Sequence, residues 1–256
     1  MPKTRIQKVL SSAGVASRRA IEQMVRDGRI TVNDRAITDL PCFVESGDEI
    51  CVDGRRVSAA PGETVVFLLN KPKGVVCTQR DPAGRRRAVD MIPPIQQRVY
   101  CAGRLDADST GLVVLTNDGE LTNYLTHPRY GVTKTYVVEV DGRIGGDAVE
   151  RLKSGVWLEG TKRSAWVKVL RRSSTRSVLQ VRICEGRNRQ VRRVLSRLGY
   201  RARRLKRTAI GPFTDRGLKV GSFHQLTAAQ IAKLRSAGEA DKDSTRPARA
   251  KKKKRR

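Results

Sequence analysis

Residues Gly103–Gly119 read GRLDADSTGLVVLTNDG, a polar loop that runs into an apolar segment. Arg104 and Asp106 lie two residues apart in this loop, and its glycines would let a polymer backbone approach closely. An aspartate among cationic side chains is expected to be ionised at neutral pH, which suits a nucleophile better than a general acid. The spacing alone leaves a second interpretation open, in which the loop is an Asx-type turn shaped mainly by Asp108.

Strands dominate the chain around this loop. Residues rich in Val, Leu and Ile predict strands at 65–69, 112–115, 136–140, 165–170 and 178–183. Helical periodicity is found in fewer segments, at 120–125, 147–152, 188–198 and 228–235. Thr227 and Gln230 have the spacing of a capping box at the start of the last helix. Strands outnumber helices without regular alternation, so we predict an α+β fold on a mixed, largely antiparallel sheet with flanking helices.

The first sixty residues have a different pattern. Apolar residues recur at helical spacing from Ile6 to Ala13, and Gly14 can end this helix in a left-handed conformation. Ser17 can cap a second helix, which Gly28 can end. Short strands with turns are predicted at 29–33 and 48–54. We therefore expect a small module at 1–57, a linker at 58–63, a larger domain at 64–236 and a disordered basic tail at 237–256.

The charge of the chain is strongly positive. It contains 53 Lys and Arg against 25 Asp and Glu, a net charge of +28, and the tail from 237 to 256 accounts for only 6 of these charges. So large an excess on the folded part attracts a polyanion, and nucleic acid is the usual one. There is no apolar run long enough to span a membrane and no signal-peptide segment after Met1, so we expect a soluble, cytoplasmic protein without a membrane partner.

Cysteines, histidines and nucleotide-binding motifs narrow the possible chemistry. Five widely spaced cysteines without a C-x-x-C pair are typical of reduced, mostly buried thiols, and with only two histidines we expect no metal site. Neither G-x-G-x-x-G nor a P-loop motif is present, which argues against ATPases, dehydrogenases and glycine-motif methyltransferases. Any chemistry is therefore expected to depend on carboxylates and arginines.

Four ordered motifs resemble those of the RsuA/RluB-type pseudouridine synthases. They are Lys71–Gly74, Gly103–Gly119, His127–Tyr136 and Glu185–Arg193, within a match from Val65 to about Leu234. The N-terminal segment is similar to a small S4 (αL-type) RNA-binding module, through Arg5–Ala20 and Gly28–Asn33. This second resemblance implies that a basic surface binds the RNA backbone. Its members are Arg5, Lys8, Arg18 and Arg19.

The first resemblance implies roles for individual residues. Asp106 falls on the catalytic aspartate, Arg104 precedes it, and Tyr136 occupies the position on which the flipped base stacks. The same resemblance implies a leucine near the uracil at Leu205, and no cofactor is required. Without it, Tyr136 and Leu205 would be interpreted as ordinary core residues. Lys134 points to the same face of its strand as Tyr136 and is expected to contact the site or a phosphate.

Arginines of the segment 187–197 are expected to serve two purposes. Arg192 aligns with the arginine expected to pair with the catalytic aspartate, and Arg187 is a second candidate. Arg189, Arg193 and Arg197 are spaced at i, i+4 and i+8 on a predicted helix, and we expect this row to contact phosphates.

The resemblance implies the reaction and leaves more than one ribosomal RNA substrate open. The form of the 185–193 motif and the long basic C-terminus favour uridine in 23S ribosomal RNA, alone or in a pre-ribosomal particle. A 16S ribosomal RNA target is the alternative. A non-catalytic RNA-binding or ribosome-assembly factor is the rival from another class, and the intact Asp106, Arg104 and Tyr136 argue against it. No heptad pattern is present, and we expect a monomer.

Overall fold

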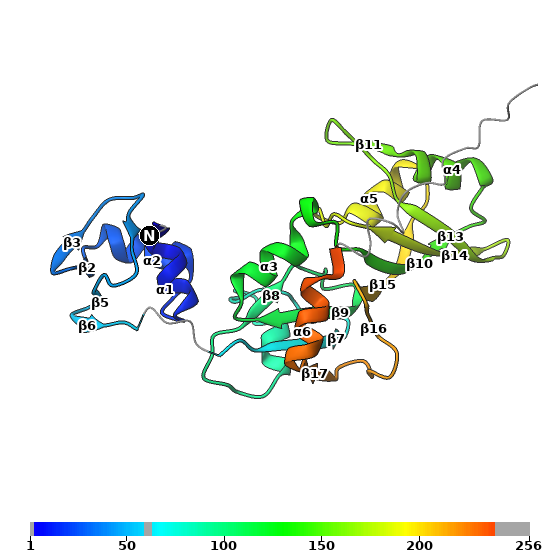
Figure 1. The fold of residues 1–256 in the computed structure, drawn as a ribbon. Helices are drawn as coiled ribbons and strands as arrows, with labels where there is room; N and C mark the ends of the chain where they lie inside the picture. The colour runs from blue at the N-terminus through cyan, green and yellow to red at the C-terminus, as the bar shows by residue number, and fades with distance from the viewer. Residues whose placement is uncertain (1–2, 59–62, 239–256) are drawn as a thin grey trace, which may run out of the picture. The chain divides into compact units, whose positions relative to one another are not determined.

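The protein is described by a computed structural model over residues 3–58 and 63–238 (Figure 1). Its residues form two units. One comprises the chain up to Val65 with the segments Ile95–Val99 and Thr116–Gly119, and the other comprises Val66–Pro94, Tyr100–Leu115 and the chain from Glu120 onward. Most of the predicted linker and tail, at 59–62 and 239–256, lies outside the described residues. Among the described helices, none is sufficiently long and apolar to cross a membrane.

The N-terminal unit is a pair of helices beside short strands. The helices are α1 (Ile6–Ser12) and α2 (Arg18–Arg26). A four-stranded sheet has the order β3-β2-β5-β6, with β2 at Ile30–Val32, β3 at Arg35–Ile37, β5 at Ile50–Val52 and β6 at Arg55–Arg56. A separate pair joins β1 (Thr4–Arg5) to β4 (Phe43–Val44). The arrangement confirms the predicted helical pair followed by strands.

The predicted signals at the ends of these helices are confirmed. The Ser17 hydroxyl accepts a hydrogen bond from the Ala20 N–H at 3.1 Å, which satisfies one of the free donors at the start of α2. Gly14 and Gly28 adopt left-handed φ angles of +81° and +67° after the two helices. Apolar residues at helical spacing meet the strands in one core. Its buried members are Ile6, Leu10, Ile21, Val25, Ile30, Val44 and Ile50.

The larger unit is built on one mixed sheet. In the described residues this sheet has nine strands, seven of them in the order β13-β14-β10-β15-β9-β7-β17. These strands are β7 (Val66–Lys71), β9 (Thr110–Thr116), β10 (Lys134–Asp141), β13 (Trp166–Arg172), β14 (Arg176–Ile183), β15 (Ala202–Ile210) and β17 (Phe223–Gln225). Two short strands join its side, β8 (Tyr100–Ala102) on β9 and β16 (Phe213–Thr214) on β15. β15 runs parallel to β9 and antiparallel to β10, so the sheet is mixed, as predicted.

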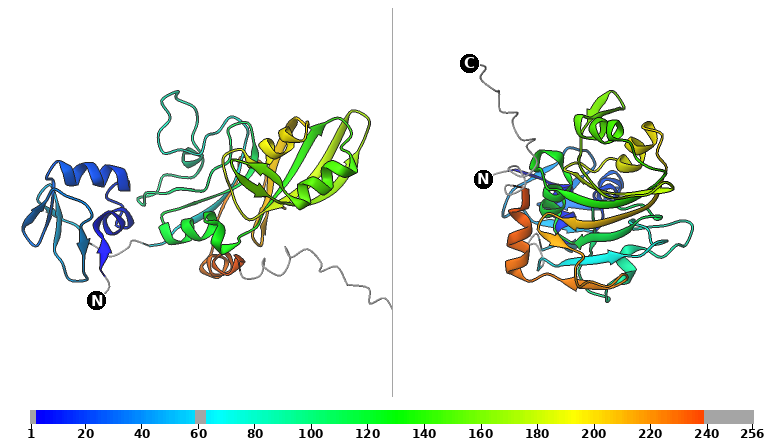
Figure 2. Two further views of the ribbon diagram at one scale, coloured as in Figure 1. Left: turned by 90° about the horizontal axis from the view of Figure 1, so that it is seen from above. Right: turned by 90° about the vertical axis from the view of Figure 1, so that its right-hand side faces the viewer.

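Helices cover the sheet. α3 (Gly119–Thr126) and α6 (Ala228–Arg235) share a core with β7 and β9, whereas α4 (Gly146–Ser154) lies against β13 and α5 (Gln190–Arg197) lies near β15 (Figures 1 and 2). Two 3-10 turns, Ala88–Met91 and Pro128–Tyr130, lie in the connections. The capping box of α6 is confirmed, since the Thr227 hydroxyl accepts from the Gln230 N–H and the Gln230 side chain accepts from the Thr227 N–H.

Several elements of this unit were not predicted, among them the short strands β8, β16 and β17. β15 carries four basic residues and was treated only as a motif, yet it lies between β10 and β9, whose pairing holds it as a strand. The hairpin of β11 (Val156–Leu158) and β12 (Thr161–Arg163) was also missed, because each strand has only three residues.

The start of the predicted tail requires a correction. Ala237 is only 4% exposed and belongs to the core formed with α3 and α6. The next residue, Gly238, donates its N–H to the Tyr124 hydroxyl at 2.8 Å. The folded unit therefore continues at least to Gly238, because a small residue at 237 packs in spite of the polar composition that follows it.

A glycine is required at position 111, where the polar loop that starts at Gly103 runs into β9. It has a φ of +110°, and a Cβ placed there would lie 2.2 Å from the Arg207 carbonyl oxygen of β15. We expect Gly111→Ala to destabilise the larger unit by about 3 kcal/mol or more, because the neighbour is backbone and cannot yield. Gly142→Ala is the matched control, since Gly142 also has a positive φ of +75° but no atom within 4 Å of the added Cβ. Equal stability of the two variants in urea unfolding would contradict the close approach of β9 and β15.

Candidate active site

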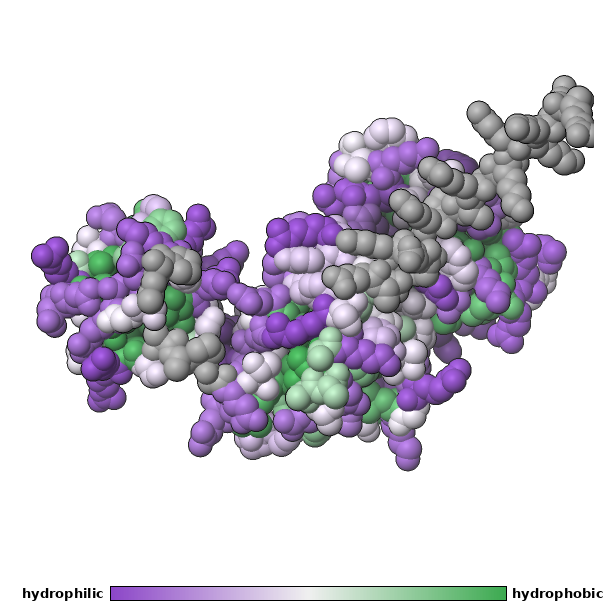
Figure 3. Space-filling view, in the orientation of Figure 1, coloured by the Kyte–Doolittle hydropathy of each residue, from purple (hydrophilic) through white to green (hydrophobic). Residues whose placement is uncertain are grey.

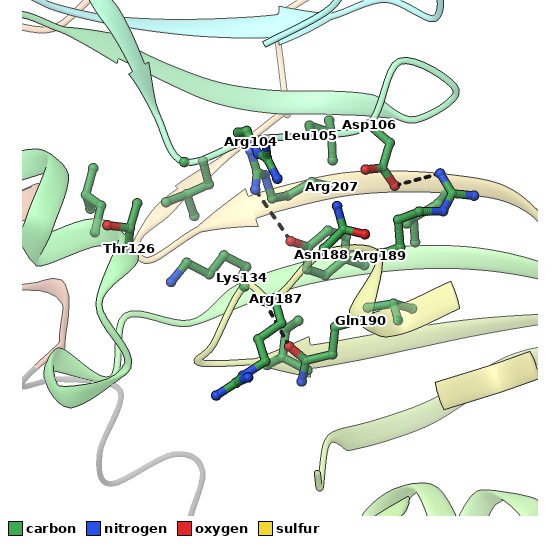
Figure 4. Close-up of a pocket in the computed structure, with 18 of the residues that line it drawn as sticks. Arg104, Leu105, Asp106, Thr126, Lys134, Arg187, Asn188, Arg189, Gln190 and Arg207 are labelled. Atoms are coloured by element: carbon green, nitrogen blue, oxygen red, sulfur yellow. Dashed lines mark hydrogen bonds and ion pairs between the residues drawn. The ribbon is translucent and has the colours of Figure 1, made fainter. Parts of the chain in front are cut away.

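A pocket of the larger unit gathers side chains from several parts of the chain, including Thr126 of α3 (Figure 4). The loop before β9 contributes Arg104 and Asp106. β10 contributes Lys134 and Tyr136, and β15 contributes Leu205 and Arg207. The loop before α5 contributes Arg187, Asn188 and Arg189. The structure thus brings together every predicted support residue except Arg192, and the parallel pairing of β15 with β9 places Leu205 and Arg207 beside the Asp106 loop.

Asp106 lies at one side of this pocket, with its carboxylate 27% exposed. Its Oδ2 atom is 3.2 Å from Nη1 of Arg189, whose Nη2 is 3.5 Å from Oδ2 of Asp108. The backbone of the loop is held in place, because the Gly74 N–H donates to the Ala107 carbonyl at 2.7 Å and the Ser109 N–H donates to the Asp106 carbonyl at 3.1 Å. The Asp106 side chain is therefore left to face the pocket.

Asp108, in the same loop, is paired with two arginines, Arg189 and Arg192. Burial alone would raise the pKa of its carboxyl, but the guanidinium groups of Arg192 and Arg189 outweigh burial, and the pKa is lowered. The Ser109 hydroxyl also donates to Asp108 Oδ1 at 3.2 Å. These contacts fit the role in shaping the loop that the spacing suggested for Asp108.

The predicted partner of Asp106 requires a correction. Arg192, whose side chain is 10% exposed, pairs with Asp108 at 3.2 Å and donates to the Ala202 carbonyl at 2.7 Å. Arg187 lies 3.8 Å from Glu159. Arg189 makes the contact instead, because it adopts a left-handed φ of +48° before α5 begins, and the helix starts two residues later than predicted.

Because α5 begins only at Gln190, the three arginines predicted to bind phosphates do not form one row along the helix. Arg189 is the residue before α5, so it does not continue the i, i+4, i+8 row along the helix surface. Arg193 is 2.7 Å from Glu159, and Arg197 is exposed in the last turn of α5, away from the pocket. The three side chains therefore lie in different surroundings.

Tyr136 forms part of the pocket wall. It is 6% exposed, and its hydroxyl lies 3.4 Å from Nη1 of Arg207. Lys134, two residues earlier on β10, also lines the pocket, as predicted from strand alternation, and its ammonium donates to the Cys184 carbonyl at 3.2 Å. An aromatic residue whose polar end is held by a cation can present its remaining surface to a flat base.

Arg207 was not predicted as a site residue. It is only 5% exposed, its Nε donates to the Leu112 carbonyl at 2.6 Å, and its buried Nη2 has no hydrogen-bond partner in the structure. Strand alternation offered a signal, because Arg207 is two residues from Leu205 and shares its face of β15. A buried cation here adds positive charge beside the pocket.

Lys71 and two cysteines lie near this cation. Burial lowers the pKa of the Lys71 ammonium, which donates to the Val75 carbonyl at 2.8 Å. A hydrogen bond from Cys101 lowers the pKa of the Cys77 thiol to about 6 in spite of burial, and the Leu105 N–H and the two cations add to this lowering. All five cysteines are free, as predicted, and each is partly buried rather than fully enclosed in the core.

We expect Cys77 to react as a thiolate at lower pH than the other cysteines. Since its pKa is lowered to about 6, its rate of alkylation by iodoacetamide should rise with pH around pH 6, whereas alkylation of Cys42, whose pKa is raised by burial, should rise only at higher pH. Peptide mass spectrometry across a pH series measures both rates. Cys101→Ala should move the Cys77 midpoint upward. A Cys77 midpoint near 9 in the unmodified protein would contradict the hydrogen bond.

In the part of the chain that the structure describes, no group of His, Cys, Asp or Glu side chains is arranged to hold a metal ion.

Residues 65–197 match the family model described as RNA pseudouridylate synthase, and residues 4–50 match that of the S4 domain. The chain belongs to the RNA pseudouridylate synthase family. It is therefore a pseudouridine synthase that isomerises uridine in RNA and carries an N-terminal S4 domain.

Relatives of this pseudouridine synthase cover nearly its whole length. "Ribosomal large subunit pseudouridine synthase B" of Bacillus subtilis (strain 168) is 40% identical over 94% of this chain and 99% of its own. A protein of Aquifex aeolicus (strain VF5), "uncharacterized RNA pseudouridine synthase", is 38% identical over 91% of this chain and 94% of its own. A solved structure entitled "Crystal structure of pseudouridylate synthase" is 28% identical, with a TM-score of 0.65, covering 90% of this chain and 99% of that one. The fold is thus shared with this structure over most of the chain.

Proposed function

We propose that this pseudouridine synthase acts on uridine in large-subunit ribosomal RNA, with Asp106 as its catalytic residue. The observation that carries the proposal is the meeting of Asp106, Tyr136, Leu205 and Arg207 in one pocket. A single carboxylate, a stacking surface and an apolar wall are what a base needs when it is detached, turned and rejoined without leaving the site.

The reaction is balanced without a cofactor. The bond from uracil N1 to the ribose C1′ breaks, a bond from C5 to C1′ forms, the C5 proton is lost and N1 gains a proton. Asp106 attacks or stabilises the sugar or the base, and Arg189 orients its carboxylate through the 3.2 Å contact. Tyr136 and Leu205 hold the detached base, and their burial limits the entry of water.

The S4 domain is proposed to add a second set of RNA contacts, separate from the residues of the pocket. Arg18 and Arg19 occupy the first turn of α2, where positive side chains oppose the helix dipole unless an anion is bound. With Arg5 and Lys8 they are exposed, as a surface for phosphates requires. Hydrophilic side chains cover most of the face seen in Figure 3, in line with the net charge of +28.

The choice of large-subunit RNA is supported by the name of the Bacillus subtilis relative, which matches this chain from end to end. Transcripts of 23S and 16S ribosomal RNA carrying tritium at uridine C5 test this choice, because the C5 hydrogen is released to water as the new bond forms. We expect release from the 23S transcript at a level of one uridine or a few. Release from the 16S transcript alone would contradict the proposed substrate, and release from neither would contradict the choice of free ribosomal RNA.

A further inference from the structure

Both tryptophans of the chain lie on the surface of the larger unit, and Trp157 is the more exposed. Trp157 is 65% exposed and Trp166 is 37% exposed. Trp166 is covered in part by the Arg182 guanidinium, 4.3 Å from its ring centroid, whereas Trp157 has no such contact with another described residue. A tryptophan usually contributes to a core or to an interface, because of the large apolar area that it buries. The fold does not account for this exposure.

The β11–β12 hairpin fixes the direction of Trp157. Its turn consists of Glu159 and Gly160, both with left-handed φ angles, which is typical of a tight two-residue hairpin. Val156 and Leu158 are buried on the side of the hairpin that lies against α5. Trp157 points to the opposite side, with Lys162 directly across from it in the register. Because side chains alternate along the strands, Trp157 and Lys162 form the outer, exposed face of the hairpin.

The hairpin is tied to the rim of the active-site pocket. Glu159 in its turn lies 2.7 Å from Arg193 and 3.8 Å from Arg187, and Arg187 lines the pocket that contains Asp106. On the second strand, Arg163 pairs with Glu185 at the start of the same motif. Figure 1 shows the hairpin projecting from the body of the unit beside α5. An RNA strand that leaves the pocket past Arg187 would therefore meet the hairpin next.

The charges around Trp157 fit a polyanion. Lys162 is exposed beside the ring, and the one carboxylate of the hairpin, Glu159, is already neutralised by two arginines. The pKa of Glu159 is lowered by the hydrogen bond and charge of Arg193, in agreement with this neutralisation. An exposed aromatic ring flanked by cations is the usual platform on which proteins stack unpaired bases. A purely apolar protein partner would leave Lys162 without a counterpart.

We propose that the outer face of the β11–β12 hairpin is a nucleotide-binding platform, on which Trp157 stacks an unpaired base that flanks the target uridine while Lys162 contacts its phosphate. The proposal rests on the proposed function only in naming ribosomal RNA as the strand; the platform itself requires only single-stranded RNA. Trp157 would then be a specificity-determining residue outside the catalytic pocket.

Intrinsic fluorescence tests the platform directly. In a Trp166→Phe variant, Trp157 is the one remaining tryptophan, since the chain has two. We expect a short single-stranded oligouridylate to quench its emission, and a blunt RNA duplex of the same length to leave it largely unchanged, because a duplex offers no unpaired base to stack. Unchanged emission with both RNAs would overturn the proposal, as would equal quenching by both, which indicates contact through charge alone.

Kinetics on the tritium-labelled 23S transcript test the consequence for the substrate. We expect Trp157→Ala to raise KM about 5- to 150-fold with little change in kcat, as the loss of one stacked base implies. Trp157→Phe should restore most of the affinity, and Leu170→Ala, which trims an exposed apolar residue of β13, should behave as wild type. A wild-type KM for Trp157→Ala would overturn the platform. Failure of the wild-type enzyme to turn over any 23S transcript would instead refute the proposed substrate, and the fluorescence result would still decide on the platform.

Discussion

Asp106→Asn is expected to lower the rate of pseudouridine formation by at least about 10⁴-fold, with RNA affinity nearly unchanged. The amide keeps the shape of the side chain but carries no negative charge, so it can neither attack nor stabilise a positive centre. Asp106 is only partly buried and, within residues 3–58 and 63–238, its carboxylate is held by the Arg189 side chain rather than by a backbone group, so the fold should be retained. Single-turnover release of tritium from the labelled transcript measures the rate, and a filter-binding assay measures the affinity.

Asp108→Asn is the matched control for this result. Asp108 lies two residues away in the same loop and contacts the same arginine, but it does not line the pocket that holds Tyr136. We expect Asp108→Asn to lower the rate of pseudouridine formation far less than Asp106→Asn does, because only the support of the loop is weakened. If the two variants lost activity to the same extent, the loss would reflect the shape of the loop rather than the chemistry of one carboxylate.

Arg189→Ala is expected to reduce kcat by about 10²- to 10³-fold while leaving the melting temperature close to that of wild type. Its guanidinium bridges Asp106 and Asp108, so its removal frees the catalytic carboxylate to adopt other rotamers. The side chain is 44% exposed, so little packing is lost with it. Single-turnover kinetics and calorimetry on the same preparation separate the two effects.

Arg192→Ala provides the contrast. This side chain is largely buried and holds the Ala202 carbonyl and the Ser109 hydroxyl, so its loss should destabilise the larger unit by about 2–4 kcal/mol. If Arg192→Ala were as stable as wild type but inactive, while Arg189→Ala retained turnover, Arg192 would be the arginine that serves Asp106 once RNA is bound.

Local patterns predicted much of the fold. Buried and partly buried positions alternate from Tyr136 to Asp141 in β10 and from Ser177 to Ile183 in β14, because one face of each strand is set by the core. Helix ends at Gly14, Gly28 and Thr227 followed from capping chemistry that operates within a few residues. Pairing between strands that are far apart in the sequence was harder to predict. The sequence of β15 looks like that of a basic loop, and its pairing with β9 and β10 is what makes it a strand.

The site was predictable to the same degree. The order of the motifs placed Asp106, Arg104, Tyr136 and Leu205 together, and the structure brings them into one pocket. The partner of Asp106 was not predictable from helical spacing, because it depends on the left-handed φ of the residue before α5. Arg207 was missed because β15 was not predicted as a strand, so the alternation that links Arg207 to Leu205 could not be applied.

Mapping of pseudouridine in cells tests the central claim most directly. Carbodiimide treatment of both ribosomal RNAs from cells that lack this protein, complemented with wild type or with Asp106→Asn, locates every modified uridine. We predict that at least one site in 23S ribosomal RNA disappears in the deletion strain, returns with wild type and stays absent with Asp106→Asn. If no site disappears, or if Asp106→Asn restores the lost site, the proposed substrate or the catalytic role of Asp106 is wrong.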